Sequence, residues 1–220
     1  MKAIDLLSNT IPPLKTSDNG SKALRIMSEL HIMHLPIVNE QQLLGLISED
    51  DILNVHGEDA PIGSLPLSFI RPFIRDHEHL FEVLKVATEF KLSAVPVIDS
   101  EENYLGSITR EMLLDCIATE TDILEPGGII VLELNIKDYS LAEIARIVES
   151  DHIKILSVFA GSNFDSNKME LTLKVNQTDL QPLIASFNRH NYKVKETFQE
   201  PEYFDNIKDR YDALMNYLNI

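Results

Sequence analysis

Ser48 and Asp51 are the residues whose types and spacing most clearly allow chemistry. They lie in the segment Gly45–Leu53, where an apolar run typical of a strand ends near Ile47 and a polar helix start follows. At a helix N-terminus, this pair places a hydroxyl and a carboxylate beside free backbone N–H groups. The carboxylate can accept hydrogen bonds from both hydroxyls of a ribose, and the N–H groups favour a phosphate.

The same spacing also fits a purely structural role. A Ser-x-x-Asp sequence resembles a helix capping box, in which two side chains exchange hydrogen bonds with backbone N–H groups of the first turn. On spacing alone, this structural interpretation is favoured over ligand binding. The chemistry at Ser48 and Asp51 therefore depends on what the fold places around them.

Metal binding and catalysis find no support in the sequence. The run Asp76–His79 holds two histidines, but side chains two residues apart on a helix point in different directions. No distant Cys or His completes a ligand set. Phosphate-binding glycine loops, nucleophile elbows and triad signatures are also absent, so we expect no metal, no required cofactor and no enzyme activity.

The segment that contains Ser48 has a counterpart further along the chain. Pro36 and Pro96 lie sixty residues apart, each inside a short apolar run, and the glycines of the following strands, Gly45 and Gly106, are sixty-one apart. A polar hairpin loop tolerates the extra residue. An offset kept across both halves indicates an internal repeat. Three further pairs keep the offset of sixty: Pro12 and Pro72, Ala23 and Val83, and Leu24 and Leu84.

Each copy predicts the order strand, helix, strand, strand, helix. A proline-containing extended segment is followed by helix-start residues, a run with helical periodicity, and two apolar strands joined by a polar turn. Prolines inside apolar strands indicate edge positions or strand ends, where a missing N–H costs little. The predicted segments are Ile11–Lys15 and Pro72–Arg75, helix starts at Ser17-Asp18 and Asp76, strands around Pro36 and Pro96, strands Leu43–Ile47 and Tyr104–Ile108, and helices from Ser48 and Thr109.

The pattern changes after the turn-forming cluster Glu125–Gly128, which marks the predicted domain boundary. The residues that follow predict strand, helix, strand, strand, helix, strand, which is the ferredoxin-like order. Tyr203–Ile220 then forms an amphipathic run at helical spacing, which must dock on its own chain or on a partner. The six predicted elements are Ile129–Ile136, Ser140–Ser150, Ile153–Ala160, Lys168–Val175, Thr178–Arg189 and Tyr192–Phe198.

Composition disfavours several partners. The 220 residues carry a formal net charge of −16, from 19 basic and 35 acidic side chains, and Lys and Arg are scattered singly. Such a surface repels nucleic-acid phosphates and anionic membranes. We expect a soluble cytoplasmic protein, because the N-terminus does not resemble a signal peptide and no apolar run is long enough to cross a bilayer. Cys116 is the only cysteine and is expected to be buried packing.

The first half of the chain resembles a CBS-domain pair, or Bateman module. The resemblance covers about Lys2–Glu120 and rests on the duplicated element order, the Leu/Val-Pro-hydrophobic-hydrophobic strands and the Gly-x-x-Ser/Thr turns. It implies clefts between paired repeats that bind adenosine compounds such as AMP, ADP, ATP or S-adenosylmethionine. In such clefts the motif hydroxyl and the aspartate three residues later hold the ribose.

Carried over residue by residue, the resemblance implies at most one competent adenosine site. Ser48 and Asp51 match the motif in the first copy, whereas the second copy has Thr109 followed by Met112, which cannot accept a ribose hydroxyl. Further residues are implied to enclose the base, although the same side chains suit ordinary core positions, and the histidine could stack or contact a phosphate. They are His34, Leu35, Pro36, Ile11 and Pro12 in the first cleft, and Thr109, Val95 and Pro96 in the weaker second cleft.

The second domain resembles an ACT domain, a ferredoxin-like regulatory module that commonly binds amino acids between two copies. CBS pairs fused to such domains occur in bacterial regulators related to acetoin-utilisation proteins. ACT ligand turns usually contain glycine, but Ser140 stands near that place, so a plain dimerisation module is the alternative. The expected α+β chain has a CBS pair at 1–125 (repeats at about 1–60 and 61–125), an ACT-like domain at 126–200 and a C-terminal amphipathic helix at 201–220.

These observations lead to two hypotheses about function. In the first, a non-enzymatic regulatory sensor binds an adenosine nucleotide between the repeats and alters how the subunits of a homodimer, or an unidentified protein partner, pack. In the second, the chain is a structural or partner-binding dimeric subunit with a degenerate ligand site, which the loss of the aspartate at Met112 favours.

Overall fold

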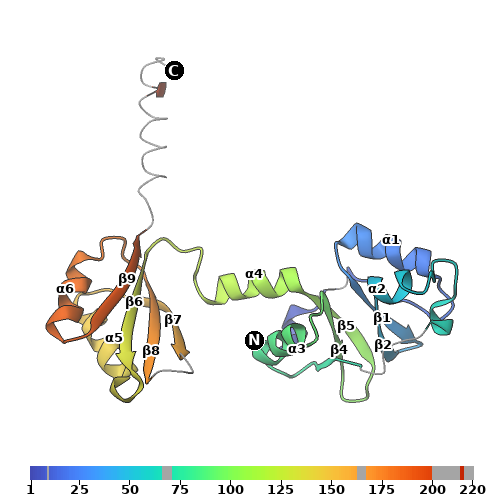
Figure 1. The fold of residues 1–220 in the computed structure, drawn as a ribbon, viewed down its shortest axis with the longest axis horizontal. Coiled ribbons are helices and arrows are strands. Elements are labelled where there is room, and N and C mark those ends of the chain that lie inside the picture. Colours follow the sequence, from blue (N-terminus) through green and yellow to red (C-terminus); the bar gives the residue numbers. More distant parts are fainter. Residues whose placement is uncertain (9, 66–70, 163–166, 200–213, 216–220) are drawn as a thin grey trace. The chain divides into compact units, whose positions relative to one another are not determined.

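A computed structural model describes residues 1–8, 10–65, 71–162, 167–199 and 214–215. The chain forms two compact units, Met1–Ile117 and Ala118–Ile220, shown in Figure 1. Each unit has its own sheets and its own hydrophobic core. The division lies within a helix, α4 (Arg110–Glu120), and the domain limits expected from the sequence, with a boundary after residue 125, stay predictions.

The first unit contains the duplicated elements. Strand β1 pairs with β2 in an antiparallel hairpin, and β4 lies between β3, which is parallel to it, and β5, which is antiparallel. In the first copy the elements are η1 (Ala3–Leu6), α1 (Gly20–Leu30), β1 (His34–Asn39), β2 (Gln42–Ser48) and α2 (Glu49–Leu53), followed by η2 (Ile62–Ser64). The second copy has β3 (Ile74–Arg75), α3 (Leu80–Glu89), β4 (Ala94–Ile98), β5 (Tyr104–Thr109) and α4.

The internal repeat is visible in the hydrogen-bond register. Leu14 forms a parallel bridge with Ile37, and Ile74 pairs in parallel with Val97, so both partners keep the offset of sixty. In each hairpin the register shifts immediately after this residue, at Ile37 and at Val97. The duplication therefore extends to backbone pairing.

Two details of the predicted repeat are wrong. Ile11–Lys15 is not a strand, because in this segment only Leu14 bonds to β1, through its N–H to the Pro36 carbonyl and its carbonyl to the Val38 N–H, both at 2.8 Å. Pro96 is not on an edge strand either, since β4 has neighbours on both sides. The short β3 pairs only with the last two residues of β4, beyond Pro96, so the missing N–H is not needed there.

The first helix of each copy begins later than the sequence predicts. The N-cap residues are Asn19 and His79, not Ser17-Asp18 and Asp76. Asp18 instead closes the preceding turn, because its carboxylate accepts the Lys15 N–H at 2.9 Å. Its counterpart in the second copy, Glu78, accepts the Arg75 N–H in the same way. The second helices follow Ser48 and Thr109, as predicted.

The cores of the two repeats interlock. Leu46 of the first repeat packs into the core of the second, and Ala94 of the second packs into the core of the first. A small cluster of Val38, Leu43 and Ile98 also joins the two hairpins. Burial on both sides of this junction therefore holds β2 and β4 in fixed relation within the unit.

The second unit has the element order predicted for it. Its four strands form one antiparallel sheet in the order β7-β8-β6-β9, and α5 and α6 cover one face (Figure 1). The core between sheet and helices includes Leu132, Val148 and Phe187. The predicted helix Tyr203–Ile220 lies almost wholly outside the described residues. The elements are β6 (Gly128–Asn135), η3 (Ile136–Asp138), α5 (Leu141–Ser150), β7 (Ile155–Ser162), β8 (Lys168–Val175), α6 (Gln181–Arg189) and β9 (Lys193–Gln199).

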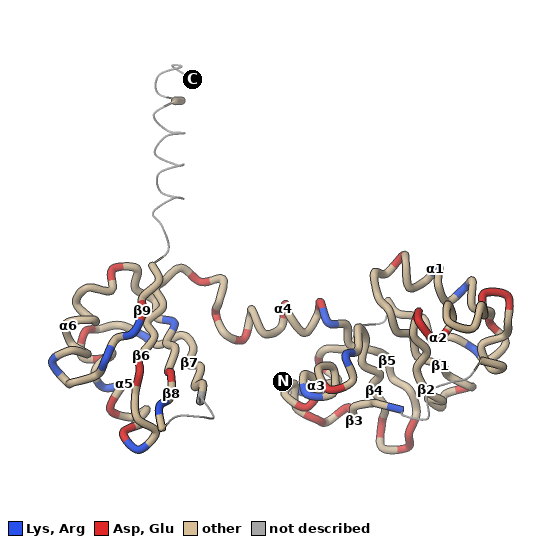
Figure 2. The backbone as a smooth tube through the Cα atoms, viewed as in Figure 1, with Lys and Arg blue, Asp and Glu red and all other residues tan. Residues whose placement is uncertain are grey.

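Charged residues of both signs are spread over both units (Figure 2). Among the described residues, no helix combines the length and the apolar character that a membrane crossing requires. Cys116 is buried in the core of the second repeat, as expected.

Candidate functional site

A cavity of about 240 Å³ lies between the two repeats of the first unit. It brings together three of the residues singled out in the sequence, His34, Ser48 and Asp51. The other lining residues are Leu46 from the first repeat and Pro72, Phe90 and Leu92 from the second. The cavity thus combines a hydroxyl, a carboxylate and an imidazole with apolar walls, the composition typical of small-ligand sites.

Ser48 and Asp51 form the capping box that the spacing predicts. The Ser48 hydroxyl oxygen accepts the Asp51 N–H at 3.1 Å, and the Asp51 carboxylate oxygen Oδ2 accepts the Ser48 N–H at 2.9 Å. Both side chains are half-buried. Both side chains can form further hydrogen bonds while they cap the helix, because the Asp51 carboxylate has a second oxygen and the Ser48 hydroxyl has a proton to donate. Capping therefore fixes the two groups where a ligand could meet them.

His34 joins this pair through the β1–β2 hairpin. In the antiparallel register His34 is directly opposite Ser48, so the hairpin places the ring beside the first residue of the motif. Alternation along β1 turns the next side chain to the core, where Leu35 is fully buried. One strand therefore supplies both a cavity residue and a core residue.

The His34 ring also contacts the second repeat. Ser93 donates its backbone N–H to His34 Nδ1 at 3.3 Å, and its hydroxyl oxygen lies 3.1 Å from the same nitrogen. Burial lowers the pKa of His34, and Arg110 lowers it further, whereas the nearby carboxylates of Asp51 and Asp50 act in the opposite direction. Neutral imidazole is thereby favoured.

The remaining residues implied for the first cleft do not line this cavity. Leu35 and Ile11 belong to the core of the first repeat, Pro36 is buried in β1, and Pro12 is exposed. A base-binding role for these four residues stays a prediction.

The residues named for the second cleft are likewise not part of this cavity. Val95 and Pro96 are buried in β4, and the Thr109 hydroxyl caps α4 by accepting the Met112 N–H at 3.1 Å. Met112 packs against the core of the second repeat, where the first repeat has the carboxylate of Asp51.

Sequence reasoning missed the residues that the second repeat contributes. Pro72, Phe90, Leu92 and Ser93 were not named as site residues because base contacts were sought within a single copy. The offset of sixty did contain a signal, since Pro72 is the counterpart of Pro12. The offset could not show, however, that the motif of the first repeat faces the second repeat.

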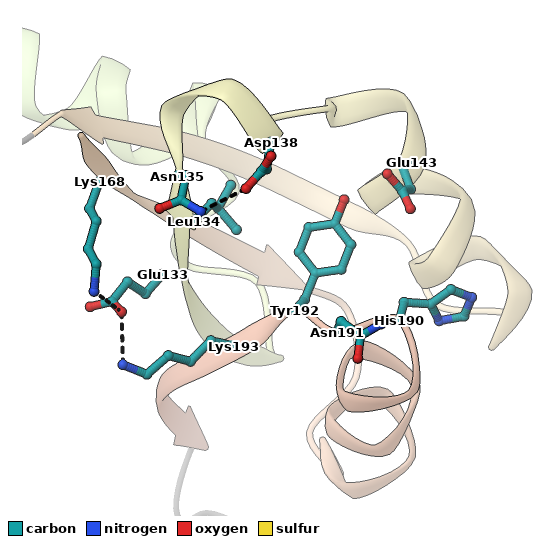
Figure 3. Close-up of a pocket in the computed structure, with 10 residues that line it drawn as sticks. All are labelled: Glu133, Leu134, Asn135, Asp138, Glu143, Lys168, His190, Asn191, Tyr192 and Lys193. Carbon is teal, nitrogen blue, oxygen red and sulfur yellow. Dashed lines mark hydrogen bonds and ion pairs between the residues drawn. The ribbon is translucent and has the colours of Figure 1, made fainter.

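A second, polar cavity of about 470 Å³ lies in the second unit (Figure 3). Glu133 accepts hydrogen bonds from Lys168 and Lys193 at 2.8 Å each, which lowers its pKa to about 2. Burial, reinforced by Glu143, raises the pKa of Tyr192 to about 12. The cavity thus has both cationic and anionic groups. The lining residues are Glu133, Leu134, Asn135, Asp138, Glu143, Lys168, His190, Asn191, Tyr192 and Lys193.

The β6–α5 connection forms part of this cavity, through Asn135 and Asp138. Ser140 caps α5, with its hydroxyl oxygen accepting the Glu143 N–H at 3.4 Å, as the sequence allows. The Asp138 carboxylate accepts a hydrogen bond from the Asn135 side chain at 2.7 Å. Nowhere among the described residues do three or more His, Cys, Asp or Glu side chains gather as a metal site would require.

Comparison with known proteins gives partial similarities. A homoserine O-acetyltransferase of Methanococcus vannielii is 26% identical over 123 residues, which is 51% of this chain but only 24% of that protein. The chain thus spans about a quarter of that relative. A CBS domain pair/ACT domain protein of Thermotoga maritima shows 17% identity and a TM-score of 0.49, covering 54% of this chain and 98% of its own. CBSX2, solved in complex with AMP, shows 20% identity and a TM-score of 0.46, covering 54% and 96%.

The CBS domain matches twice in this chain, over residues 3–58 and 70–124. The two matches correspond to the two copies that the offset of sixty defines, and together they cover half of the chain. The protein belongs to the CBS domain family and contains a CBS domain pair.

Proposed function

We propose that this protein is a non-enzymatic regulatory sensor that binds an adenosine nucleotide between its two CBS domains. CBS-pair proteins commonly bind ligands such as AMP or ATP in a regulatory role. The observation that carries the proposal is that His34, Ser48 and Asp51 line one cavity together with residues of the second repeat. AMP, ADP, ATP and S-adenosylmethionine are the candidate ligands.

The chemistry of the cavity suits the nucleoside part of such a ligand. The Asp51 carboxylate can accept both ribose hydroxyls, and Ser48 can donate its hydroxyl proton to the sugar. Phe90, Leu46 and Leu92 provide apolar and aromatic surface for the base. Because about 240 Å³ is smaller than the roughly 300–1,000 Å³ of typical ligand pockets, the phosphates would extend outside the cavity.

Regulation then follows from the position of the ligand between the repeats. A ligand shifts a conformational equilibrium only when it binds one arrangement more tightly than the other. A nucleotide that contacts residues of both repeats makes different contacts when the position of one repeat relative to the other changes. We propose that this change reaches a second subunit of a cytoplasmic homodimer or a protein partner.

We further propose that the second unit is an ACT-type ferredoxin-like regulatory domain, similar to those in acetoin-utilisation-type CBS/ACT regulators. Its element order and the antiparallel order β7-β8-β6-β9 support this assignment. The polar cavity next to the β6–α5 connection lies where an amino acid would be sought. A dimerisation role without a ligand is the alternative for this unit.

A structural or partner-binding subunit is the second candidate for the whole protein. It is favoured by exposed apolar side chains on the first unit, such as Leu114 (67% exposed) and Met33 (48%). Both line a mainly apolar cavity of about 570 Å³ beside α3 and α4. Exposed apolar surface of this kind is typical of interaction sites.

Thermal unfolding with and without ligand separates the two candidates. Wild type, Asp51→Ala and the matched control Asp50→Ala are measured with AMP, ADP, ATP and S-adenosylmethionine in turn. A ligand at about a hundred times its dissociation constant stabilises the folded protein by roughly 2.7 kcal/mol. We expect this stabilisation in wild type and in Asp50→Ala, whose exposed side chain does not line the cavity, and a loss of it in Asp51→Ala.

Two results would contradict the proposal at different levels. If none of the four compounds stabilises the wild type, the sensor function is wrong and the structural candidate is preferred. If the stabilisation is unchanged in Asp51→Ala, a nucleotide binds but Asp51 does not hold its ribose.

A further inference from the structure

His34 and Ser93 form a polar link between the two repeats at the edge of the candidate nucleotide cavity. Ser93 lies just before β4 and is only 7% exposed, yet it makes three contacts with the first repeat. Its hydroxyl oxygen accepts the Met33 N–H at 2.8 Å and lies 3.1 Å from His34 Nδ1. Its own backbone N–H donates to the same Nδ1 at 3.3 Å.

These contacts determine which nitrogen of His34 is protonated. A backbone N–H can only donate, so Nδ1 has to be the acceptor. The Ser93 oxygen already accepts the Met33 N–H, which leaves its own proton for Nδ1 as well. Neutral imidazole has one acceptor and one donor nitrogen, and therefore the proton resides on Nε2. Protonating Nδ1 would bring two N–H donors face to face.

We propose that His34 selects the ligand of this cavity as a neutral hydrogen-bond donor, with its Nε2–H directed to an acceptor atom of the nucleoside and its tautomer set by Ser93 of the other repeat. This inference rests on the proposed nucleotide-binding function. The charged groups that act on the ring are Asp50 and Asp51 from α2 and Arg110 from α4.

The role differs from the two that the sequence leaves open for a histidine, stacking and contact with a phosphate. A cationic histidine would strengthen binding in proportion to the charge of the phosphate group. A neutral donor to the base or sugar instead contributes equally to adenosine and to AMP, because both carry the same nucleoside. Comparing these two ligands therefore identifies which role His34 has.

The experiment titrates the full-length protein with adenosine and with AMP by calorimetry at pH 7.5. The variants are His34→Ala, which removes the donor, and His34→Gln, whose side-chain amide retains an N–H near the position of Nε2. His77→Ala is the matched control, since His77 is exposed and does not line the cavity. Circular dichroism and thermal unfolding check that each variant is folded.

We expect His34→Ala to weaken the binding of adenosine and of AMP by the same factor, about three- to tenfold, as the loss of one neutral hydrogen bond implies. We expect His34→Gln to recover most of the affinity and His77→Ala to match wild type. Nitrogen-15 NMR of the histidine rings in the wild type should show His34 with an unprotonated Nδ1 and a protonated Nε2 at pH 7.5. The NMR measurement does not depend on any variant folding.

Several results would overturn the inference. A loss confined to AMP would identify a phosphate contact, and unchanged affinity in His34→Ala would exclude a contact with the ligand. A protonated Nδ1 in the NMR spectrum would contradict the tautomer. If the wild type binds neither compound, the inference fails; the proposed function fails with it only if ADP, ATP and S-adenosylmethionine do not bind either, whereas the other results leave that function standing.

Discussion

At the scale of single residues, Asp51 has a structural and a proposed functional role in the same place. Its Oδ2 accepts the Ser48 N–H and so completes the capping box of α2, while the side chain also lines the cavity between the repeats. The two roles are compatible because one carboxylate has two oxygens. Helix α2 has only five residues, so its N-terminal hydrogen bonds are a large share of those it makes.

We therefore expect Asp51→Ala to be less stable than wild type even without a ligand. The substitution leaves the Ser48 N–H without its acceptor, and loss of a capping interaction costs about 0.5–2 kcal/mol. Urea unfolding measures the difference, with Asp50→Ala as control. An Asp51→Ala protein as stable as the wild type would mean that the capping box contributes nothing measurable.

His34 makes the stability of the first unit sensitive to pH. Burial lowers its pKa below the ordinary value of 6.5, so between those two values the unfolded chain binds more protons than the folded protein. The contribution of His34 to stability is then complete above about pH 6.5 and decreases as the pH falls through the lowered value.

The corresponding measurement is urea unfolding at several pH values from 7.5 to 5. We expect stability to fall on acidification, and to fall less in His34→Gln, whose amide does not titrate. Other histidines and carboxylates contribute in both proteins, so the difference between the two curves isolates His34. Parallel curves would show that His34 has the same pKa in the folded and unfolded states.

At the scale of secondary-structure elements, the site depends on how two hairpins meet. The β1–β2 hairpin places His34 opposite Ser48, and β4 begins directly after Ser93. Leu46 and Ala94, each packed in the other repeat's core, hold the hairpins together. The polar contacts of Ser93 are formed across this apolar junction, where unsatisfied groups are costly.

Ser93→Ala tests that junction. The substitution removes the acceptor of the Met33 N–H, and loss of one such hydrogen bond costs about 0.5–1.5 kcal/mol. Ser64→Ala is the control, because Ser64 is exposed and its hydroxyl donates to a carbonyl in its own turn. Denaturant unfolding should show a clear loss of unfolding free energy for Ser93→Ala and little change for Ser64→Ala. Equal effects would mean that the inter-repeat contacts of Ser93 do not contribute to stability.

At the scale of the whole molecule, the two units have separate hydrophobic cores. Among the described residues, those of the second core, such as Ile144, Leu171 and Phe187, lie after residue 117, and those of the repeat cores lie before it. Each core is large enough to define its own cooperative folding unit. A ligand bound to the first unit and a substitution in the core of the second unit should therefore change different unfolding transitions.

Differential scanning calorimetry can resolve these transitions. We expect AMP to raise the midpoint temperature of the first unit's unfolding transition only. We expect Phe187→Ala to lower the midpoint temperature of the second unit's transition only, by the equivalent of about 3–5 kcal/mol. The two perturbations serve as controls for each other. One transition that responds to both would show that the units unfold together.

Much of this architecture was predictable from periodicity. The offset of sixty and the alternation of apolar residues predicted both hairpins and most helices, because those patterns come from burial on one face of an element. The details that failed depend on hydrogen bonds to partners distant in sequence. Leu14 makes only a bridge to β1, and the first helices are capped by Asn19 and His79 after a turn closed by Asp18 or Glu78.

By itself, the sequence determined the duplication, the capping motif at Ser48 and Asp51, and the asymmetry at Met112, because local spacing and residue type carry that information. Only the tertiary structure decided which residues share a cavity. Phe90 and Leu92 line the same cavity as the first repeat's motif, and Ser93 bonds to His34 beside it, because the two cores interlock, and no local pattern encodes those contacts. The same packing turns Leu35 and Ile11 into core residues and sets the tautomer of His34.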